Sequence, residues 1–455
     1  AAPLPPSEML RLNAWSRSPD DVPDAVRPYT TRPDLRGAGG DGGYDAPSEA
    51  DLCSRAVVVA TCSMAAMLHN LGGGTLHTAP MRGAFDFIVI DEAGHAWEPE
   101  TTACASALMP ANAAAAGSDP AAPSIVAALT KAFGGLMGRA RAAGTQLVMA
   151  GDPKQLGPIV RSPLAQQYGL GVSALERLMD RPVYARRPGE FPAGGGYDCR
   201  LLTKLVRNYR SHPAILRLPN RMFYDDELVP CASALVGGNL ERWEHLVTAG
   251  FPLIFHGVEG RDQREESSPS WFNAEECEVV KDYVDRLTQQ TRMNRVAASQ
   301  IGVITPYNKQ AQKLRLTLRA YGMEDVAVGS VEKFQGEERR VIIISTVRSS
   351  EQFVDFDLQH NLGFLSNPKR FNVAVTRAQA LLIVVGNPRV LAADEHWGAL
   401  LWHCVDGGGY TGCPLPPRDP AARAQDAAAV LDSILAGELE EGDEPDSGGE
   451  SGAED

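Results

Sequence analysis

Short apolar runs rich in β-branched residues alternate with longer amphipathic stretches along most of the chain. Runs of this length between polar turns predict buried strands, and the amphipathic stretches predict helices. The predicted strands are 56–62, 85–90, 145–150, 253–258, 302–305, 326–330, 341–347 and 381–385. The predicted helices are 7–16, 274–288, 308–321, 389–404 and, more weakly, 421–435. Strands that alternate with helices in this way are typical of parallel sheets, so we expect an α/β fold.

Interruptions of this alternation set the expected domain boundaries. Residues 1–48 are rich in Pro, Gly and Asp and do not make a complete domain, so we interpret them as a connector or a domain remnant. An Ala/Pro-rich segment at 110–124 predicts a surface loop, and a Gly/Pro-rich segment at 186–197 predicts a linker. We therefore expect a first α/β domain at 49–190, a second at 198–404, an extension at 405–435 and a disordered acidic tail at 436–455.

Charge and composition narrow the class of protein. The 455 residues carry 43 basic and 57 acidic side chains, which gives −14, and nine of the acidic residues lie in 438–455. Without these nine the charge is −14 + 9 = −5, so the acidic total does not argue against a local basic groove for nucleic acid. No apolar run reaches the roughly 20 residues that span a bilayer, so we expect no membrane partner. The eight cysteines contain no C-x-x-C pair, which favours reduced thiols in a cytosolic protein.

Polar residues that follow two predicted strands are candidates for phosphate chemistry. Asp91 and Glu92 follow strand 85–90, at the end where parallel sheets bind ligands. In P-loop NTPases an Asp here holds Mg²⁺ and a following Glu can polarise the attacking water. Gln155 lies in the Gly/Pro-rich loop after strand 145–150 and could contact a γ-phosphate. Each segment also fits an ordinary turn, so both interpretations stay open at this point.

The second half of the chain adds further candidates. Arg210 and Arg377 could stabilise phosphoryl-transfer charge, although a single Arg is more often part of a surface ion pair. His212 fits a helix cap or a packing residue better than a catalyst. Tyr307, at a strand end, could stack on a base or could be ordinary packing. The run Phe334-Gln335-Gly336-Glu337-Glu338 fits either a binding loop or a solvated acidic turn.

The order of these segments is more specific than any one of them. They read DEAG, GDPKQLGP, NYRSHP, ITPYNKQ, VGSVEKFQGEE and NVAVTRAQ. This ordered set resembles motifs II, III, IV, IVa, V and VI of superfamily-one helicases of the Upf-one-like kind. Longer stretches, such as GFPLIFHGV and LGFLSNPKRFNVAVTRAQALLIVVGNP, are similar to the Armitage / Mov-ten branch of RNA helicases. The resemblance runs from Ser7 to Pro416 and implies tandem RecA-like (P-loop NTPase) domains, the first one incomplete.

The resemblance also implies ATP and Mg²⁺ as cofactors and gives roles to the matching positions. Asp91 would hold Mg²⁺, Glu92 would activate the water and Gln155 would sense the γ-phosphate. Arg210 and Arg377 would be the arginine fingers. The nucleotide would meet Tyr209, Gly336 and Glu338. Single-stranded RNA would meet Thr61, Ser63, Thr305, Pro306, Tyr307 and Ser330.

The function implied by the resemblance is an ATP-dependent RNA helicase or translocase. Members of the family move 5′ to 3′ on single-stranded RNA, and this branch acts in RNA silencing and in the restraint of retroelements and viruses. The partners implied are Argonaute, other RNA-silencing proteins and mRNA-decay proteins. The location implied is the cytoplasm, with ribonucleoprotein granules (P-bodies) as an open alternative. Two other functions stay open: a non-hydrolysing RNA-binding or scaffold form, and a DNA helicase.

One element of the family pattern is missing from this sequence. None of the eight lysines follows a glycine, so the phosphate-binding loop G-x-x-x-x-G-K-[ST] is absent. The backbone amides and the lysine of that loop hold the β- and γ-phosphates. We therefore expect the chain to be the C-terminal part of a longer helicase and to be inactive or unstable by itself. Its first sheet should lack a strand and expose an edge and part of a core.

Overall fold

The computed structural model describes residues 4–14, 17–31, 44, 47–68, 81, 83–109, 145–192, 195–233, 240–265, 270–289, 295–350 and 367–418. The chain divides into two compact units, Ala1–Val206 and Arg207–Asp455. The segment 186–197, which we interpreted as a linker, lies within the first unit, and the division falls after it. The predicted loop at 110–124, the predicted helix at 421–435 and the acidic tail at 436–455 lie outside the described residues.

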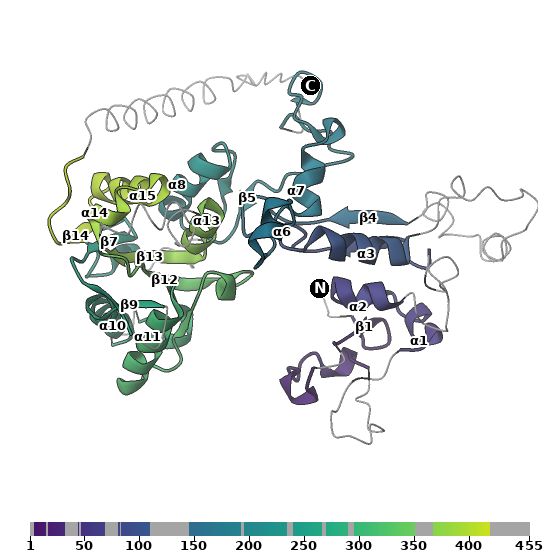
Figure 1. Cartoon of the computed structure of the whole chain (residues 1–455), viewed down its shortest axis with the longest axis horizontal. Helices are drawn as coiled ribbons and strands as arrows, with labels where there is room; N and C mark the ends of the chain where they lie inside the picture. Colours follow the sequence, from purple (N-terminus) through teal and green to yellow (C-terminus); the bar gives the residue numbers. More distant parts are fainter. Residues whose placement is uncertain are drawn as a thin grey trace, which may run out of the picture. The chain divides into compact units, whose positions relative to one another are not determined.

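A six-stranded parallel sheet forms the centre of the second unit, which confirms the α/β class (Figure 1). The strand order is β11-β10-β12-β13-β7-β14, and each neighbouring pair is parallel. The strands are β7 (Leu253–Gly257), β10 (Ile301–Ile304), β11 (Ala327–Gly329), β12 (Arg339–Ser345), β13 (Ala378–Gly386) and β14 (Tyr410–Gly412). Five of them correspond to predicted strands, and β14 is an edge strand that the hydrophobic pattern did not reveal.

Helices cover both faces of this sheet, so its central strands are buried on both sides. Figure 1 shows α10 (Ala274–Thr288) and α11 (Asn308–Ala320) on one face. The other face carries α8 (Pro213–Phe223), α13 (Pro368–Thr376), α14 (Pro388–Leu391) and α15 (Glu395–Asp406). This double cover explains why β12 and β13 are almost continuously apolar in sequence, because neither face meets water.

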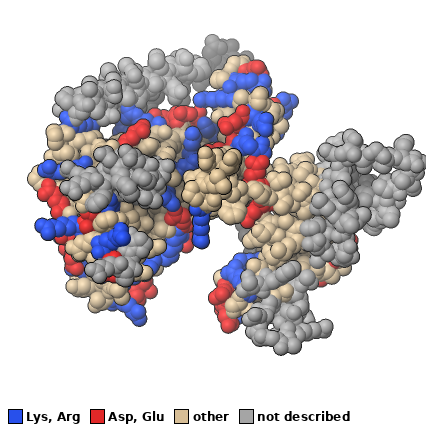
Figure 2. Space-filling view, viewed as in Figure 1, with Lys and Arg blue, Asp and Glu red and all other residues tan. Residues whose placement is uncertain are grey.

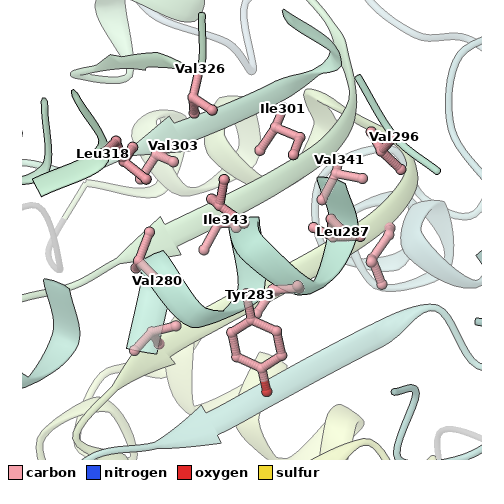
Figure 3. Close-up of a cluster of buried hydrophobic side chains, with 14 of the residues drawn as sticks. Val280, Tyr283, Leu287, Val296, Ile301, Val303, Leu318, Val326, Val341 and Ile343 are labelled. Carbon is pink, nitrogen blue, oxygen red and sulfur yellow. The ribbon is translucent and has the colours of Figure 1, made fainter. Parts of the chain in front are cut away.

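Two apolar clusters hold the layers of the second unit together. On the α10 and α11 face, Val280 and Leu287 pack against strand residues that include Val341 and Ile343 (Figure 3). On the other face, Phe371 of α13 is fully buried and meets the ring of Trp397 edge-on, with 4.9 Å between the ring centroids. The two clusters attach one helical layer each to the same strands.

The first unit contains two separate parallel strand pairs. β1 (Met9–Arg11) pairs with β2 (Val57–Val59), and β3 (Phe87–Ile90) pairs with β4 (Gln146–Met149). One face of these strands packs on the helices α1 (Glu49–Cys53), α2 (Cys62–Met67) and α3 (Glu98–Leu108). The helices α6 (Pro163–Gln167) and α7 (Ala174–Met179) follow β4 in the chain. The other face leaves Phe87 and Val89 exposed at 55 % and 63 %. This apolar face of β3 therefore stays exposed among the described residues.

Three of the predicted elements are wrong or incomplete. The predicted helix at 7–16 is instead the strand β1, because Met9–Arg11 pairs with Val57–Val59. The predicted strand 56–62 ends early because the Thr61 side chain caps α2. The predicted helix 389–404 is two helices, α14 and α15, because Asp394 accepts the backbone N–H groups of His396 and Trp397 and starts a new helix.

The hydrophobic pattern also missed several short strands. An antiparallel hairpin joins β8 (Asp262–Arg264) to β9 (Trp271–Asn273), and β5 (Arg207–Asn208) pairs with β6 (Val229–Pro230). Strands of two or three residues are too short to show a period of two. No helix in the described part of the chain is long and apolar enough to cross a membrane.

Candidate nucleotide and RNA sites

In the first unit, the two loops with predicted catalytic residues lie side by side. They follow β3 and β4, which are neighbouring parallel strands, so their carboxyl ends lie at the same edge. The N–H of Ala93 donates to the carbonyl of Ala150 at 2.8 Å and joins the two loops directly. The structure therefore brings Asp91 and Glu92 to the same edge as Gln155.

The turn at Asp91 and Glu92 presents both carboxyl groups to solvent. Both residues are exposed, and the Asp91 carboxylate accepts the N–H of Glu92 at 2.9 Å. Glu92 has a φ of 52°, in the left-handed region that residues other than glycine seldom adopt. Unusual backbone at a strand end, with two exposed carboxylates, is typical of a ligand-binding turn.

Gln155 is oriented by Asp152, a residue that the sequence did not single out. The Gln155 Nε2 donates to one carboxylate oxygen of Asp152 at 2.9 Å. The N–H of Lys154 donates to the other oxygen at 2.8 Å. Asp152 is therefore a positioning residue for Gln155, and its place in the GDPKQ segment was the available signal.

The close approach of these two loops requires glycine at position 151. A Cβ on Gly151 would lie 2.9 Å from the backbone nitrogen of Gly94 and 3.1 Å from that of Ala93. Gly151→Ala should therefore push the loops apart and lower the free energy of unfolding by about 1–3 kcal/mol. Urea denaturation checks this result, with Gly189→Ala as the control because a Cβ there meets nothing within 4 Å. Equal stability of the two variants would contradict it.

In the second unit, Arg210 and Glu338 form an ion pair although 128 residues separate them. The Arg210 Nε donates to Glu338 at 2.6 Å, and the Gln379 Nε2 donates to the other carboxylate oxygen at 2.7 Å. The guanidinium of Arg210 holds the pKa of the Glu338 carboxyl below its usual value. Gln379 was not predicted as a site residue, although it follows Arg377 by two positions in the segment NVAVTRAQ.

Backbone contacts fix the position of Arg210. The Asn208 side chain accepts the N–H groups of Arg210 and Ser211, both at 3.0 Å. His212 caps α8, with its Nδ1 accepting the N–H of Ala214 at 3.1 Å, which confirms its interpretation as a capping residue. The N–H of His212 donates to the carbonyl of Gln379 at 2.8 Å, so the segment around Arg210 is joined to the segment after α13.

Arg377, the second predicted finger, is buried in the second unit. It is only 2 % exposed. Its Nε donates to the carbonyl of Val373 at 3.2 Å, and its Nη1 donates to the carbonyl of Glu337 at 3.4 Å. Arg210 therefore presents a side chain at the surface, whereas Arg377 also supports the packing between α13 and the turn before β12.

The predicted nucleotide contacts Tyr209 and Gly336 are both exposed. The Tyr209 side chain is 66 % exposed, next to Arg210 in sequence. Gly336 has a φ of +72°, and its turn is closed by the N–H of Glu337 donating to the carbonyl of Phe334 at 3.1 Å. That φ explains why glycine stands between Gln335 and Glu337.

The predicted RNA contacts fall on both units. Thr61 caps α2, and the Ser63 hydroxyl donates to Glu100 at 3.4 Å. In the second unit, Thr305, Pro306 and Tyr307 follow β10, and Ser330 follows the adjacent β11. Thr305 is buried, and its Oγ1 has no hydrogen-bond partner within the described residues.

The residues present fit a nucleotide with magnesium. Mg²⁺ in such sites takes one or two carboxylates and completes its shell with phosphate oxygens and waters. The exposed Asp91 can supply the carboxylate, and the described residues hold no larger cluster of His, Cys, Asp and Glu. Arg210 can meet a phosphate, and Glu338 can accept hydrogen bonds from hydroxyl groups.

Among the residues that Figure 2 colours, Lys and Arg side chains lie close to Asp and Glu side chains.

Comparison with known proteins gives consistent relatives. A family described as an AAA domain matches residues 175–389. The mouse protein "RNA helicase Mov10l1" is 44 % identical over 413 residues, which cover 90 % of this chain and 30 % of that protein. The chicken "Putative helicase MOV-10" is 41 % identical and covers 95 % and 42 %, respectively. The Drosophila "Probable RNA helicase armi" is 34 % identical and covers 90 % and 32 %.

The chain spans about a third of the length of mouse Mov10l1 and of armi, and about two fifths of the length of chicken MOV-10. Among solved structures, "The structure of PRRSV helicase" matches with a TM-score of 0.32 and 13 % identity, covering 84 % of this chain and 47 % of that chain. Over about nine tenths of its length the chain is homologous to the RNA helicases named Mov10l1 and armi and to MOV-10, which confirms its resemblance to the Armitage / Mov-ten branch.

Proposed function

We propose that this protein is an ATP-dependent RNA helicase, with 5′-to-3′ movement on single-stranded RNA. The observation that carries the proposal is identity of 34–45 % with named RNA helicases over about nine tenths of the chain. The geometry supports it, since DEAG and GDPKQLGP follow the parallel strands β3 and β4, and ITPYNKQ lies at the carboxyl end of β10. Roles in RNA silencing and retroelement restraint, Argonaute and mRNA-decay partners, and a cytoplasmic location are part of the same proposal.

The side chains suit the steps of phosphoryl transfer. Bound Mg·ATP supplies the phosphoryl group that water attacks. Asp91 offers a carboxylate to the metal, and Glu92, next to it, can accept the proton of the water. Gln155, oriented by Asp152, can hold that water or the γ-phosphate. All of these groups lie at the carboxyl ends of β3 and β4 in the first unit.

The second unit supplies positive charge and a sugar contact. Arg210 can stabilise phosphate charge through its Nη groups, since it meets Glu338 with its Nε. Glu338, held by Arg210 and Gln379, has further lone pairs that can accept hydrogen bonds from ribose hydroxyls. The exposed ring of Tyr209 can lie against the adenine.

A second candidate is a non-hydrolysing RNA-binding form. It is favoured by one observation, the absence of a Gly-Lys step and hence of the phosphate-binding loop in this sequence. The two candidates share RNA binding and differ in ATP hydrolysis.

One pair of assays tests both candidates. Fluorescence anisotropy measures binding of the 455-residue chain to a labelled single-stranded RNA of about 20 nucleotides, with DNA of the same sequence as competitor. A phosphate-release assay measures RNA-stimulated ATP hydrolysis by this chain and by the longest form of the protein found in cells. RNA binding with hydrolysis supports the helicase, and RNA binding without hydrolysis in either form supports the second candidate. Absence of RNA binding would refute both.

A further inference from the structure

A strained backbone turn follows β12 in the middle of the sheet. Val347 has a φ of +73° and is fully buried. A β-branched residue in this region is a genuine outlier. Across it the N–H of Arg348 donates to the carbonyl of Thr346 at 2.9 Å, which makes a three-residue turn of the rare positive-φ type. A strained conformation of this kind persists only where surrounding contacts stabilise it, and it occurs most often at ligand-binding sites and in switch regions.

Residues at the start of α10 form hydrogen bonds with both the N–H and the carbonyl of Val347. The N–H of Val347 donates to both carboxylate oxygens of Glu276, at 2.9 and 3.0 Å. The carbonyl of Val347 accepts the Asn273 Nδ2 at 3.2 Å. Glu276 and Asn273 are fully buried. The turn therefore depends on a buried carboxyl group, whose pKa is raised to about 8 by burial and which needs these hydrogen bonds.

The same carboxylate connects the turn to the predicted RNA contacts. The Ser345 hydroxyl donates to Glu276 at 2.6 Å and accepts the Gln310 Nε2 at 2.9 Å. Gln310 lies in the first turn of α11, which begins directly after Tyr307. β10 and β12 are neighbours in register, with Ile304 opposite Ile344, so their following segments lie at one edge.

The turn also fixes the β8–β9 hairpin. Arg348 donates to Asp262 at 2.6 Å, and both side chains are almost completely buried. The guanidinium of Arg348 lies 4.6 Å from the centre of the Trp271 ring on β9. The hairpin and residues 346–348 are thus joined to each other and, through Ser345 and Gln310, to the first turn of α11, which directly follows residues 305–307.

We propose that Glu276 and the strained turn at Val347 are a positioning device that holds the carboxyl edge of the second unit in the shape that receives single-stranded RNA. This inference deepens the proposed function and rests on it. The ligand is the sugar–phosphate backbone of RNA at residues 305–307, and Glu276 acts through these residues without touching the ligand. Parallel sheets bind ligands at this edge. The turn at Val347 costs free energy because its φ is positive, and hydrogen bonds to both its N–H and its carbonyl hold it there, which packing alone does not require.

The test separates positioning from stability. Glu276→Gln keeps the size of the side chain but removes one acceptor from Val347. This variant should bind the labelled RNA at least about fivefold more weakly, at a temperature where it is folded. Val347→Gly adopts the same positive φ without strain and keeps the backbone groups that bond Glu276 and Asn273, so its RNA affinity should stay within about twofold of that of the unsubstituted chain. The slope of affinity against salt should stay unchanged, because residues 305–307 are Thr, Pro and Tyr and release no counterions. Val280→Ala is the matched control, because it deletes a buried side chain from the same helix without touching the turn.

The outcomes are distinct. Binding by Val280→Ala should stay within about twofold of the unsubstituted chain even though its melting temperature falls. If Glu276→Gln does not fold, Ser345→Ala, which deletes two hydrogen bonds of the same network, takes its place. Normal RNA affinity in folded Glu276→Gln, or in folded Ser345→Ala where that variant takes its place, overturns the inference alone. A lack of RNA binding by the unsubstituted chain overturns the proposed function and the inference together.

Discussion

Arg377→Ala should lose both folding stability and catalysis, whereas Arg210→Ala should lose catalysis alone. Arg377 is buried and donates to two backbone carbonyls, so its removal deletes buried contacts and leaves acceptors unpaired. We expect a loss of about 2–4 kcal/mol in the free energy of unfolding. Arg210 makes only a partly exposed ion pair with Glu338, and such pairs contribute about 1 kcal/mol or less.

Both substitutions should slow ATP hydrolysis by about 10³-fold or more if the two residues act as arginine fingers. Urea denaturation of the 455-residue chain measures the stability difference, and phosphate release from a hydrolysing form of the protein measures the catalytic loss. The informative control is Arg210→Lys, which keeps the charge but loses the planar fork. An Arg377→Ala variant as stable as the unsubstituted chain would show that the buried contacts contribute little.

Phe371→Ala should cause a large loss of stability in the second unit. Phe371 is fully buried between α13 and α15, edge-on to Trp397 and 6.1 Å from the ring of Phe223 on α8. Three helices therefore meet at this ring. Removing a buried aromatic side chain and leaving a cavity costs about 3–5 kcal/mol. Because α13 ends at Thr376, just before Arg377, loosening it should also reduce any ATP hydrolysis.

Calorimetry or urea denaturation measures this effect. Leu316→Ala is the control, since this side chain is largely exposed on α11 and its removal should change the free energy of unfolding by no more than about 0.5 kcal/mol. A Phe371→Ala variant that melts like the Leu316→Ala variant would contradict the packing described here.

Short-range patterns predicted much of this molecule. The apolar runs located β7, β10, β11, β12 and β13 to within a few residues, because strands buried on both faces are apolar at nearly every position. The helix α10 matched its predicted bounds, since its polar and apolar positions repeat with a helical period. The pattern failed at β1, where pairing with Val57–Val59 outweighed local preference.

The order of short motifs in the sequence likewise predicted the helicase relatives and the candidate residues. What the sequence did not contain was the pairing of those residues. Glu338 meets Arg210 from 128 positions away and Gln379 from 41, and no local pattern encodes such contacts. For the same reason Gln379 and Asp152 were not recognised as partners of Glu338 and Gln155.

The sequence by itself thus determined the α/β class, most strands of the second unit and the family resemblance, because each depends on periodicity or on residue order over short spans. Only the tertiary structure decided that Arg377 is buried while Arg210 is at the surface. It alone revealed the hydrogen bonds from the Val347 N–H to the Glu276 carboxyl group. The positive φ of Val347 and these buried hydrogen bonds arise from segments that meet only in the folded chain.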